Sequence, residues 1–147
     1  TLEAYGKHFT FGDVVRASRL ALDEGVYYAH FLILGGYGDT RENVRETIEN
    51  SRRMEYTVMF PYAGMRIYPH TRLAELAAKE GVVGRDDDLL GPTYYLSPDF
   101  DLEQVRPAAL ATGKAWVFPD DPQSALADTL RLKRNKKGPL WEYLRKP

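Results

Sequence analysis

The longest apolar segment of the chain covers residues 26–34, in the order VYYAHFLIL, with His30 as its one strongly polar side chain. A continuous apolar run without alternation is typical of a strand that is buried on both faces of a parallel sheet. His30 then has two readings. In the first, His30 faces a site and acts as an acid, a base or a ligand. In the second, it is a buried histidine that forms a hydrogen bond with a neighbouring group.

Glycines crowd the turn that follows, at Gly35, Gly36 and Gly38, and a charged segment over residues 40–54 comes next. Its apolar and small side chains recur at helical spacing, which predicts an amphipathic helix. We expect Asp39 to be the N-cap and Glu42 to complete a capping box. The unit is therefore strand, glycine turn and helix, and α/β folds keep ligand sites at such strand ends.

Apolar spacing and turn signals predict the remaining elements. A helix follows a capping box at Thr10 and Asp13, and a strand at residues 57–60 ends at Pro61. A further helix is expected after the cap Thr71. Residues 101–147 are expected to be helical, with a break or kink at Pro107, a helix around residues 125–134 and a docked terminal helix.

Composition adds few constraints. The chain has 147 residues, 44% hydrophobic residues and a net charge of −1. This size suits one domain, and the charge gives no general attraction to nucleic acid or membrane. No apolar run approaches the roughly 20 residues of a spanning helix. The basic tail with Trp141 and Tyr143 permits a nucleic-acid reading, but the near-zero net charge argues against it.

The glycine spacing restricts the chemistry of the turn. No Gly-Lys-Ser/Thr follows, so it is not a phosphate loop. Gly36 and Gly38 fit a dinucleotide fingerprint, but Arg41 stands where the third glycine belongs.

The segment from Ile33 to Thr40, ILGGYGDT, resembles the end of the fifth barrel strand in the radical S-adenosylmethionine (SAM) family. That family often has Ile-x-Gly-x-Pro-Gly-Glu-Thr there, so Tyr37 replaces the proline and Asp39 the glutamate. Residues 66–73, RIYPHTRL, are similar to the family's Arg-x-Tyr-Pro-Gly-Thr-Pro-Leu segment. An Ala-x-x-Glu-Gly helix end and a Pro-x-Tyr-Tyr segment follow in the family's order, here ending at Gly81 and Tyr95.

The resemblance implies an α/β fold: residues 1–98 as the C-terminal portion of a (β/α) barrel, and residues 99–147 as a mostly helical extension. Within the family, the resemblance is to the cobalamin-associated type, which includes proteins similar to the anaerobic magnesium-protoporphyrin monomethyl ester cyclase group. These are cytoplasmic oxidoreductases that cleave SAM reductively with a four-iron four-sulfur cluster and act on a small-molecule substrate. The chain contains no cysteine, whereas a CxxxCxxC loop must hold such a cluster. We therefore expect the cluster ligands upstream in the same polypeptide, cobalamin as an optional cofactor, and no activity from this chain alone.

The resemblance also implies site residues. Ile33 and Leu34 would pack against the adenine of SAM, and Gly35 and Gly36 would let the backbone approach the ligand. Asp39 would fix the turn. A purely structural reading gives the same residues the roles of core strand, tight turn and helix cap. The alternative function is a non-enzymatic α/β module that binds a nucleotide or protein partner through the turn at residues 35–38. Under either function, open sheet edges make dimerisation of the chain an expectation.

Overall fold

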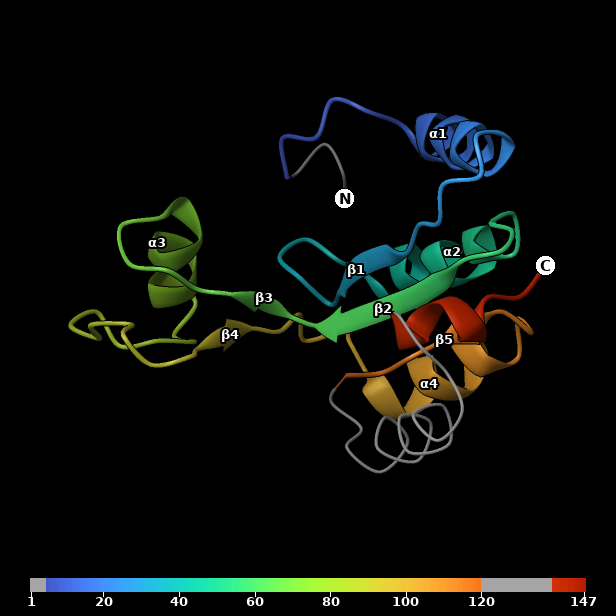
Figure 1. Ribbon diagram of the computed structural model, residues 1–147. Helices are drawn as coiled ribbons and strands as arrows, with labels where there is room; N and C mark the ends of the chain where they lie inside the picture. Colours follow the sequence, from blue (N-terminus) through green and yellow to red (C-terminus); the bar gives the residue numbers. More distant parts are fainter. Residues whose placement is uncertain (1–4, 120–138) are drawn as a thin grey trace.

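The computed structural model describes residues 5–119 and 139–147 of the chain and shows a mixed α/β fold (Figure 1). The elements, in order, are α1 (Phe11–Asp23), β1 (His30–Leu34), α2 (Arg41–Ser51), β2 (Val58–Ala63), β3 (Met65–Arg66), α3 (Arg72–Lys79), β4 (Tyr94–Tyr95), α4 (Leu102–Leu110), β5 (Ala115–Trp116) and the short 3₁₀ helix η1 (Leu140–Leu144).

The main sheet has three parallel strands in the order β1-β2-β5, which is also their order along the chain. One face of this sheet carries the core. Leu34, Met59 and Trp116 from the strands form one buried cluster with residues of α1, α2 and α4. The helical members of that cluster are Val15, Val44, Ile48, Val105 and Ala109. All three helices therefore pack on the same face of the sheet.

The opposite face of the sheet is open at its carboxyl end, so the prediction of a strand buried on both faces is wrong for the described residues. Along β1 the exposure alternates: Phe31 is 69% exposed and Ile33 is 46% exposed, whereas Leu34 is 2% exposed. At the amino end η1 packs against β2, and a bridge pairs Thr57 with Lys146. We call the uncovered part, formed by Phe31, Ile33, Phe60 and Tyr62, the open face.

A side lobe formed by β3, α3 and β4 lies beyond the carboxyl end of β2 (Figure 1). Its two strands pair antiparallel, and Ile67, Ala77 and Tyr95 are among its buried residues. Gly64 joins β2 to β3 with φ of 76°, and a Cβ at this position would lie 2.6 Å from the carbonyl oxygen of Tyr95. This close approach of two backbones requires glycine.

The predicted strand end at Pro61 is wrong, and helix α4 is not broken at Pro107, each for a local reason. Strand β2 continues through Pro61 and pairs with β1 as far as Ala63. The carbonyl of Met59 accepts from Val117, so Pro61, two residues later, faces the β5 side, and the ladder to β5 stops there. Helix α4 likewise contains Pro107, which removes only the bond to Glu103 in the exposed first turn.

Other predicted features are confirmed. Thr10 and Asp13 form a capping box on α1, and Thr71 caps α3. The terminal helix exists as η1, and the helix expected around residues 125–134 lies outside the described residues. Within the described ranges, no helix is long and apolar enough to cross a membrane.

Candidate functional site

The glycine turn at the carboxyl end of β1 closes around the carboxylate of Asp39. Asp39 Oδ2 accepts hydrogen bonds from the backbone N–H groups of Gly35 at 2.9 Å and Gly36 at 3.2 Å. Asp39 is 7% exposed. The predicted N-cap role for Asp39 is therefore wrong. Thr40 is the N-cap of α2, and its hydroxyl accepts from the backbone N–H of Asn43. The carboxylate of Asp39 instead bonds to backbone N–H groups that line a concave turn and could otherwise bind an anion.

The segment after β4 fastens this turn from a second side. The hydroxyl of Ser97 donates to the carbonyl of Asp39 at 2.7 Å, and its backbone N–H donates to the carbonyl of Gly35 at 2.7 Å. Phe100 fills the space where Gly35 has no side chain, since a Cβ there would lie 2.4 Å from Phe100 Cγ. Gly35 also has φ of 73°. The close approach that requires glycine at this position is therefore to Phe100.

Tyr5 covers the turn from a third side. A Cβ on Gly36 would lie 2.2 Å from the hydroxyl oxygen of Tyr5 and 3.4 Å from Cγ2 of Ile33. The hydroxyl is buried, and no hydrogen-bond partner for it is found among the described residues. Burial, followed by the negative charge of Asp39, raises the pKa of Tyr5 to about 12. A neutral phenol therefore stands beside Gly36 at neutral pH.

Tyr37 connects the turn to the side lobe. Its ring meets the ring of Tyr95 edge to face, with centroids 5.4 Å apart. The hydroxyl of Tyr95 donates to Glu80 at 2.8 Å, and burial together with this carboxylate raises the pKa of Tyr95 to about 12. The turn is thus the junction of the amino-terminal segment, the main sheet and the side lobe.

The predicted site residues lie in three different places. Ile33 lies on the open face, next to the turn, with its side chain half exposed. Leu34 points to the opposite face and belongs to the buried core. Gly35, Gly36 and Asp39 form the turn itself, and their tight contacts are to Phe100, Tyr5 and backbone amides. The structure therefore brings one apolar side chain, Ile33, to a surface where a ligand can reach it.

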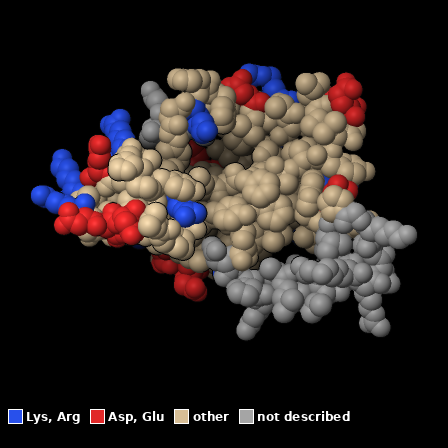
Figure 2. Space-filling model, turned by 60° about the vertical axis from the view of Figure 1, so that its left-hand side comes forward, with Lys and Arg blue, Asp and Glu red and all other residues tan. Residues whose placement is uncertain are grey.

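Ile33 belongs to a larger apolar surface that the sequence interpretation missed. Phe31 stacks on Phe60, with ring centroids 5.1 Å apart, and on Tyr62, at 6.3 Å. Such an uncovered cluster of aromatic rings is typical of a contact surface. Figure 2 shows acidic and basic side chains interspersed mainly around the periphery of the face it presents, with an extended uncharged area between them. No continuous basic patch is visible on the face drawn.

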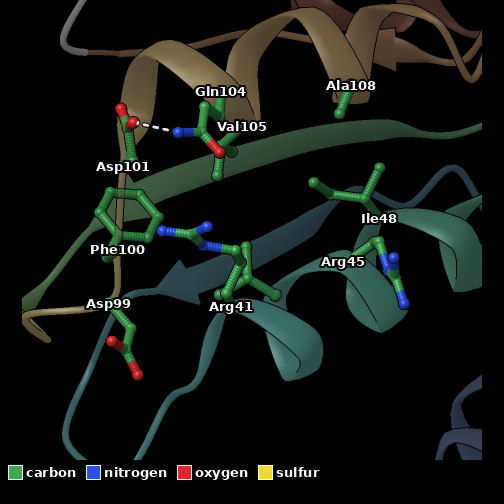
Figure 3. Close-up of a pocket in the computed structure, with 10 residues that line it drawn as sticks. Arg41, Arg45, Ile48, Asp99, Phe100, Asp101, Gln104, Val105 and Ala108 are labelled. Atoms are coloured by element: carbon green, nitrogen blue, oxygen red, sulfur yellow. Dashed lines mark hydrogen bonds between the residues drawn. The ribbon is translucent and has the colours of Figure 1, made fainter.

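Two hollows lie away from the turn. A cavity of about 300 Å³ between α2 and α4 carries the side chains of Arg41 and Arg45 (Figure 3). On its α4 side, Gln104 donates to Asp101 at 2.7 Å, and Phe100 separates this cavity from the glycine turn. A groove of about 750 Å³ lies between α1, β1 and α2.

His30 lines the groove beneath α1. Its ring meets the ring of Tyr28 edge to face, and Nε2 is buried with no hydrogen-bond partner in the part of the chain that the structure describes. Burial lowers the pKa of His30. Its side chain is on the helix-covered face of the sheet, not on the open face, because it precedes Phe31 in the strand alternation. His70 is exposed in the turn before α3.

Among residues 5–119 and 139–147, no group of three or more His, Asp or Glu side chains is placed to hold a metal ion. The described residues therefore offer no ligand set for an iron–sulfur cluster, and any cluster would need ligands from elsewhere. An exposed apolar surface, by contrast, is present at Ile33 and the adjoining rings.

Neither a family model, a curated protein nor a solved structure matched the chain.

Proposed function

We propose that the chain is the C-terminal part of a radical SAM enzyme, an iron–sulfur and SAM-dependent oxidoreductase, and that it forms the wall of the barrel that faces SAM and substrate. The observation that carries this proposal is the winding of the main sheet. Its strands follow one another in chain order, and α1, α2 and α4 all pack on one face. A doubly wound sheet has helices on both faces, whereas a (β/α) barrel has them on the outside only.

In such a barrel the open face is the interior. Phe31, Ile33 and Tyr62 would line it, and Ile33 would meet the adenine of SAM at the carboxyl end of the strand, where barrel enzymes hold their ligands. Leu34, Gly35, Gly36 and Asp39 would act indirectly, by fixing the strand end and its turn.

The rest of the enzyme would come from the same polypeptide. The four-iron four-sulfur cluster and SAM supply the radical chemistry when bound, while this chain binds, orients and shields. Cobalamin is an optional further cofactor, the substrate is a small molecule, and the location is the cytoplasm. The chain by itself is inactive, since it contains no cysteine to hold the cluster.

The second candidate is a non-enzymatic module that binds a protein partner, and the exposed ring of Phe31 favours it. Nucleotide binding through the turn is the weaker form of this candidate. The N–H groups of Gly35 and Gly36 already bond to Asp39, so a phosphate would have to displace a buried carboxylate of the same sign.

Anaerobic expression of the complete reading frame, with the cluster reconstituted, tests the proposal. The assay is formation of 5′-deoxyadenosine from SAM. We expect activity in the wild type, strong loss in Ile33→Asp, and near-normal activity in Ile33→Val, because only the first places a charge against the adenine. A complete reading frame without a CxxxCxxC segment, or tight binding of NAD but not SAM by calorimetry, would refute the proposal.

A further inference from the structure

The cavity between α2 and α4 combines an apolar floor with a charged mouth (Figure 3). Val44 and Ile48 of α2 and Val105 of α4 line it, and all three are buried members of the core cluster. Its volume of about 300 Å³ is at the small end of the range for ligand pockets. A compact molecule with a hydrophobic body therefore suits this cavity.

Arg41 offers an unpaired charge at the mouth. Its side chain extends from the first turn of α2 toward Phe100 and α4 (Figure 3). Among residues 5–119 and 139–147, no ion pair or hydrogen bond engages this guanidinium. A guanidinium presents a planar fork of N–H donors, which matches the two oxygens of a carboxylate or of a phosphate. The mouth of the cavity therefore favours an anionic group.

The other charged groups of the cavity decide between these two anions. Asp101 accepts from the backbone N–H of Glu103 at 3.0 Å and from the side chain of Gln104 at 2.7 Å. Asp99 adds a second carboxylate to the lining. Arg45 contributes little, because it points away from α4 in Figure 3. The two aspartates repel a dianion more strongly than a monoanion, so a carboxylate fits better than a phosphate.

Phe100 connects the cavity to the glycine turn. Its side chain lines the cavity, and a Cβ on Gly35 would lie 2.4 Å from its Cγ. The backbone N–H of Gly35 in turn bonds to Asp39 at 2.9 Å. A ligand that fills the cavity would hold Phe100 against this turn. Because α2 and α4 pack on the face opposite the open face, such a ligand would act on the turn from behind the sheet.

We propose that the cavity between α2 and α4 is a regulatory site for a small monocarboxylate with an apolar body. The carboxylate pairs with Arg41, the body lies on Val44, Ile48 and Val105, and Phe100 transmits occupancy to the turn at the end of β1. The inference goes beyond the proposed function and does not depend on SAM. It would therefore survive a failure to detect SAM cleavage.

The experiment titrates the chain with cyclohexanecarboxylate at neutral pH and follows the backbone amide NMR signals of Val44, Ile48 and Val105. We expect these signals to shift saturably. Cyclohexanecarboxamide has the same ring without the charge, and it should bind at least about tenfold more weakly. Cyclohexyl phosphate, which is mostly a dianion at this pH, should also bind more weakly than the carboxylate.

A matched pair of variants tests the role of Arg41. Arg41→Gln changes an exposed residue, so it should keep the urea unfolding midpoint and weaken binding of the carboxylate by at least about tenfold. Arg45→Gln makes the same change one turn along α2 and should weaken binding by less than about twofold. No saturable shift, equal losses in the two variants, or tighter binding of the amide or the phosphate would overturn the proposal.

Hydrogen exchange at the amide of Gly35 tests the connection to the turn. An opening of the turn that moves Phe100 also dismantles the site, so bound ligand opposes it. At a concentration of about ten times the Kd, cyclohexanecarboxylate should slow this exchange by about threefold to tenfold. The same concentration should have no effect in Arg41→Gln. Unchanged exchange in the saturated wild type would overturn the regulatory role.

Discussion

Replacement of Gly35 by alanine should be among the most disruptive small substitutions in the turn. The backbone of Gly35 has φ of 73°, a left-handed conformation that costs an L-residue about 1 kcal/mol. The new Cβ would also lie 2.4 Å from Cγ and 2.8 Å from Cβ of Phe100. Carbon atoms in contact normally keep about 3.5–4.0 Å. Phe100 must therefore move by roughly an ångström, and a change of rotamer cannot displace its Cβ.

Overpacking of this kind costs about 1–3 kcal/mol, so Gly35→Ala should lower the free energy of unfolding by about 2–4 kcal/mol in total. Gly38→Ala is the matched control. Gly38 has φ of 77°, but nothing lies within 4 Å of its new Cβ, so only the cost of about 1 kcal/mol remains. Urea unfolding followed by the fluorescence of buried Trp116 gives both values if the m-value is unchanged.

A double-mutant cycle separates the contact from the backbone. In a Phe100→Gly background, which removes the Cβ of residue 100 as well as its ring, the steric part disappears, so Gly35→Ala should then cost only about 1 kcal/mol. Equal losses for Gly35→Ala and Gly38→Ala, or a full loss for Gly35→Ala without the Phe100 ring, would refute the packing of Phe100 against the turn.

Three further predictions concern single polar groups. Tyr5→Phe should leave the free energy of unfolding unchanged or raise it by up to about 1 kcal/mol in urea titrations, because the hydroxyl is buried without a described partner. Tyr95→Phe should lower the free energy of unfolding by about 0.5–1.5 kcal/mol in the same titrations, because its hydroxyl bonds to Glu80. A larger loss in Tyr5→Phe than in Tyr95→Phe would contradict both assignments. Burial lowers the pKa of His30 in the folded chain. Below about pH 6.5, the ordinary pKa of histidine, the unfolded chain therefore binds a proton that the folded chain does not. The free energy of unfolding then falls as the pH falls through that region. His30→Gln should flatten this part of the stability–pH curve measured by urea unfolding, and an identical curve would exclude His30 as its source.

The features that were predictable from the sequence are those that depend on neighbours within a few residues. The caps at Thr10 and Thr71 were predicted because a hydroxyl and an amide three residues later suffice to form them. The strand end and its turn were marked by the glycines at residues 35–38. Asp39 was assigned the wrong bond, since the positive φ of Gly35 brings two amides toward its carboxylate that an ordinary helix start does not offer.

Features that depend on distant segments were not predictable. The apolar run over residues 26–34 contains no sign that one face of β1 stays open, because exposure there depends on which strands and helices reach it. The alternation of Phe31, Leu32 and Ile33 is invisible when every position is apolar. Contacts of Tyr5 and Ser97 with the turn have no sequence signal either, because they join segments far apart along the chain.

The most direct test of the proposed function is the anaerobic assay of the complete polypeptide for 5′-deoxyadenosine, run side by side on wild type, Ile33→Val and Ile33→Asp. If the open face is the interior of a SAM-binding barrel, wild type and Ile33→Val form the product and Ile33→Asp loses most of it while remaining folded. Equal product from all three variants would contradict the placement of SAM against Ile33. No product from a cluster-loaded wild type would contradict the assignment itself.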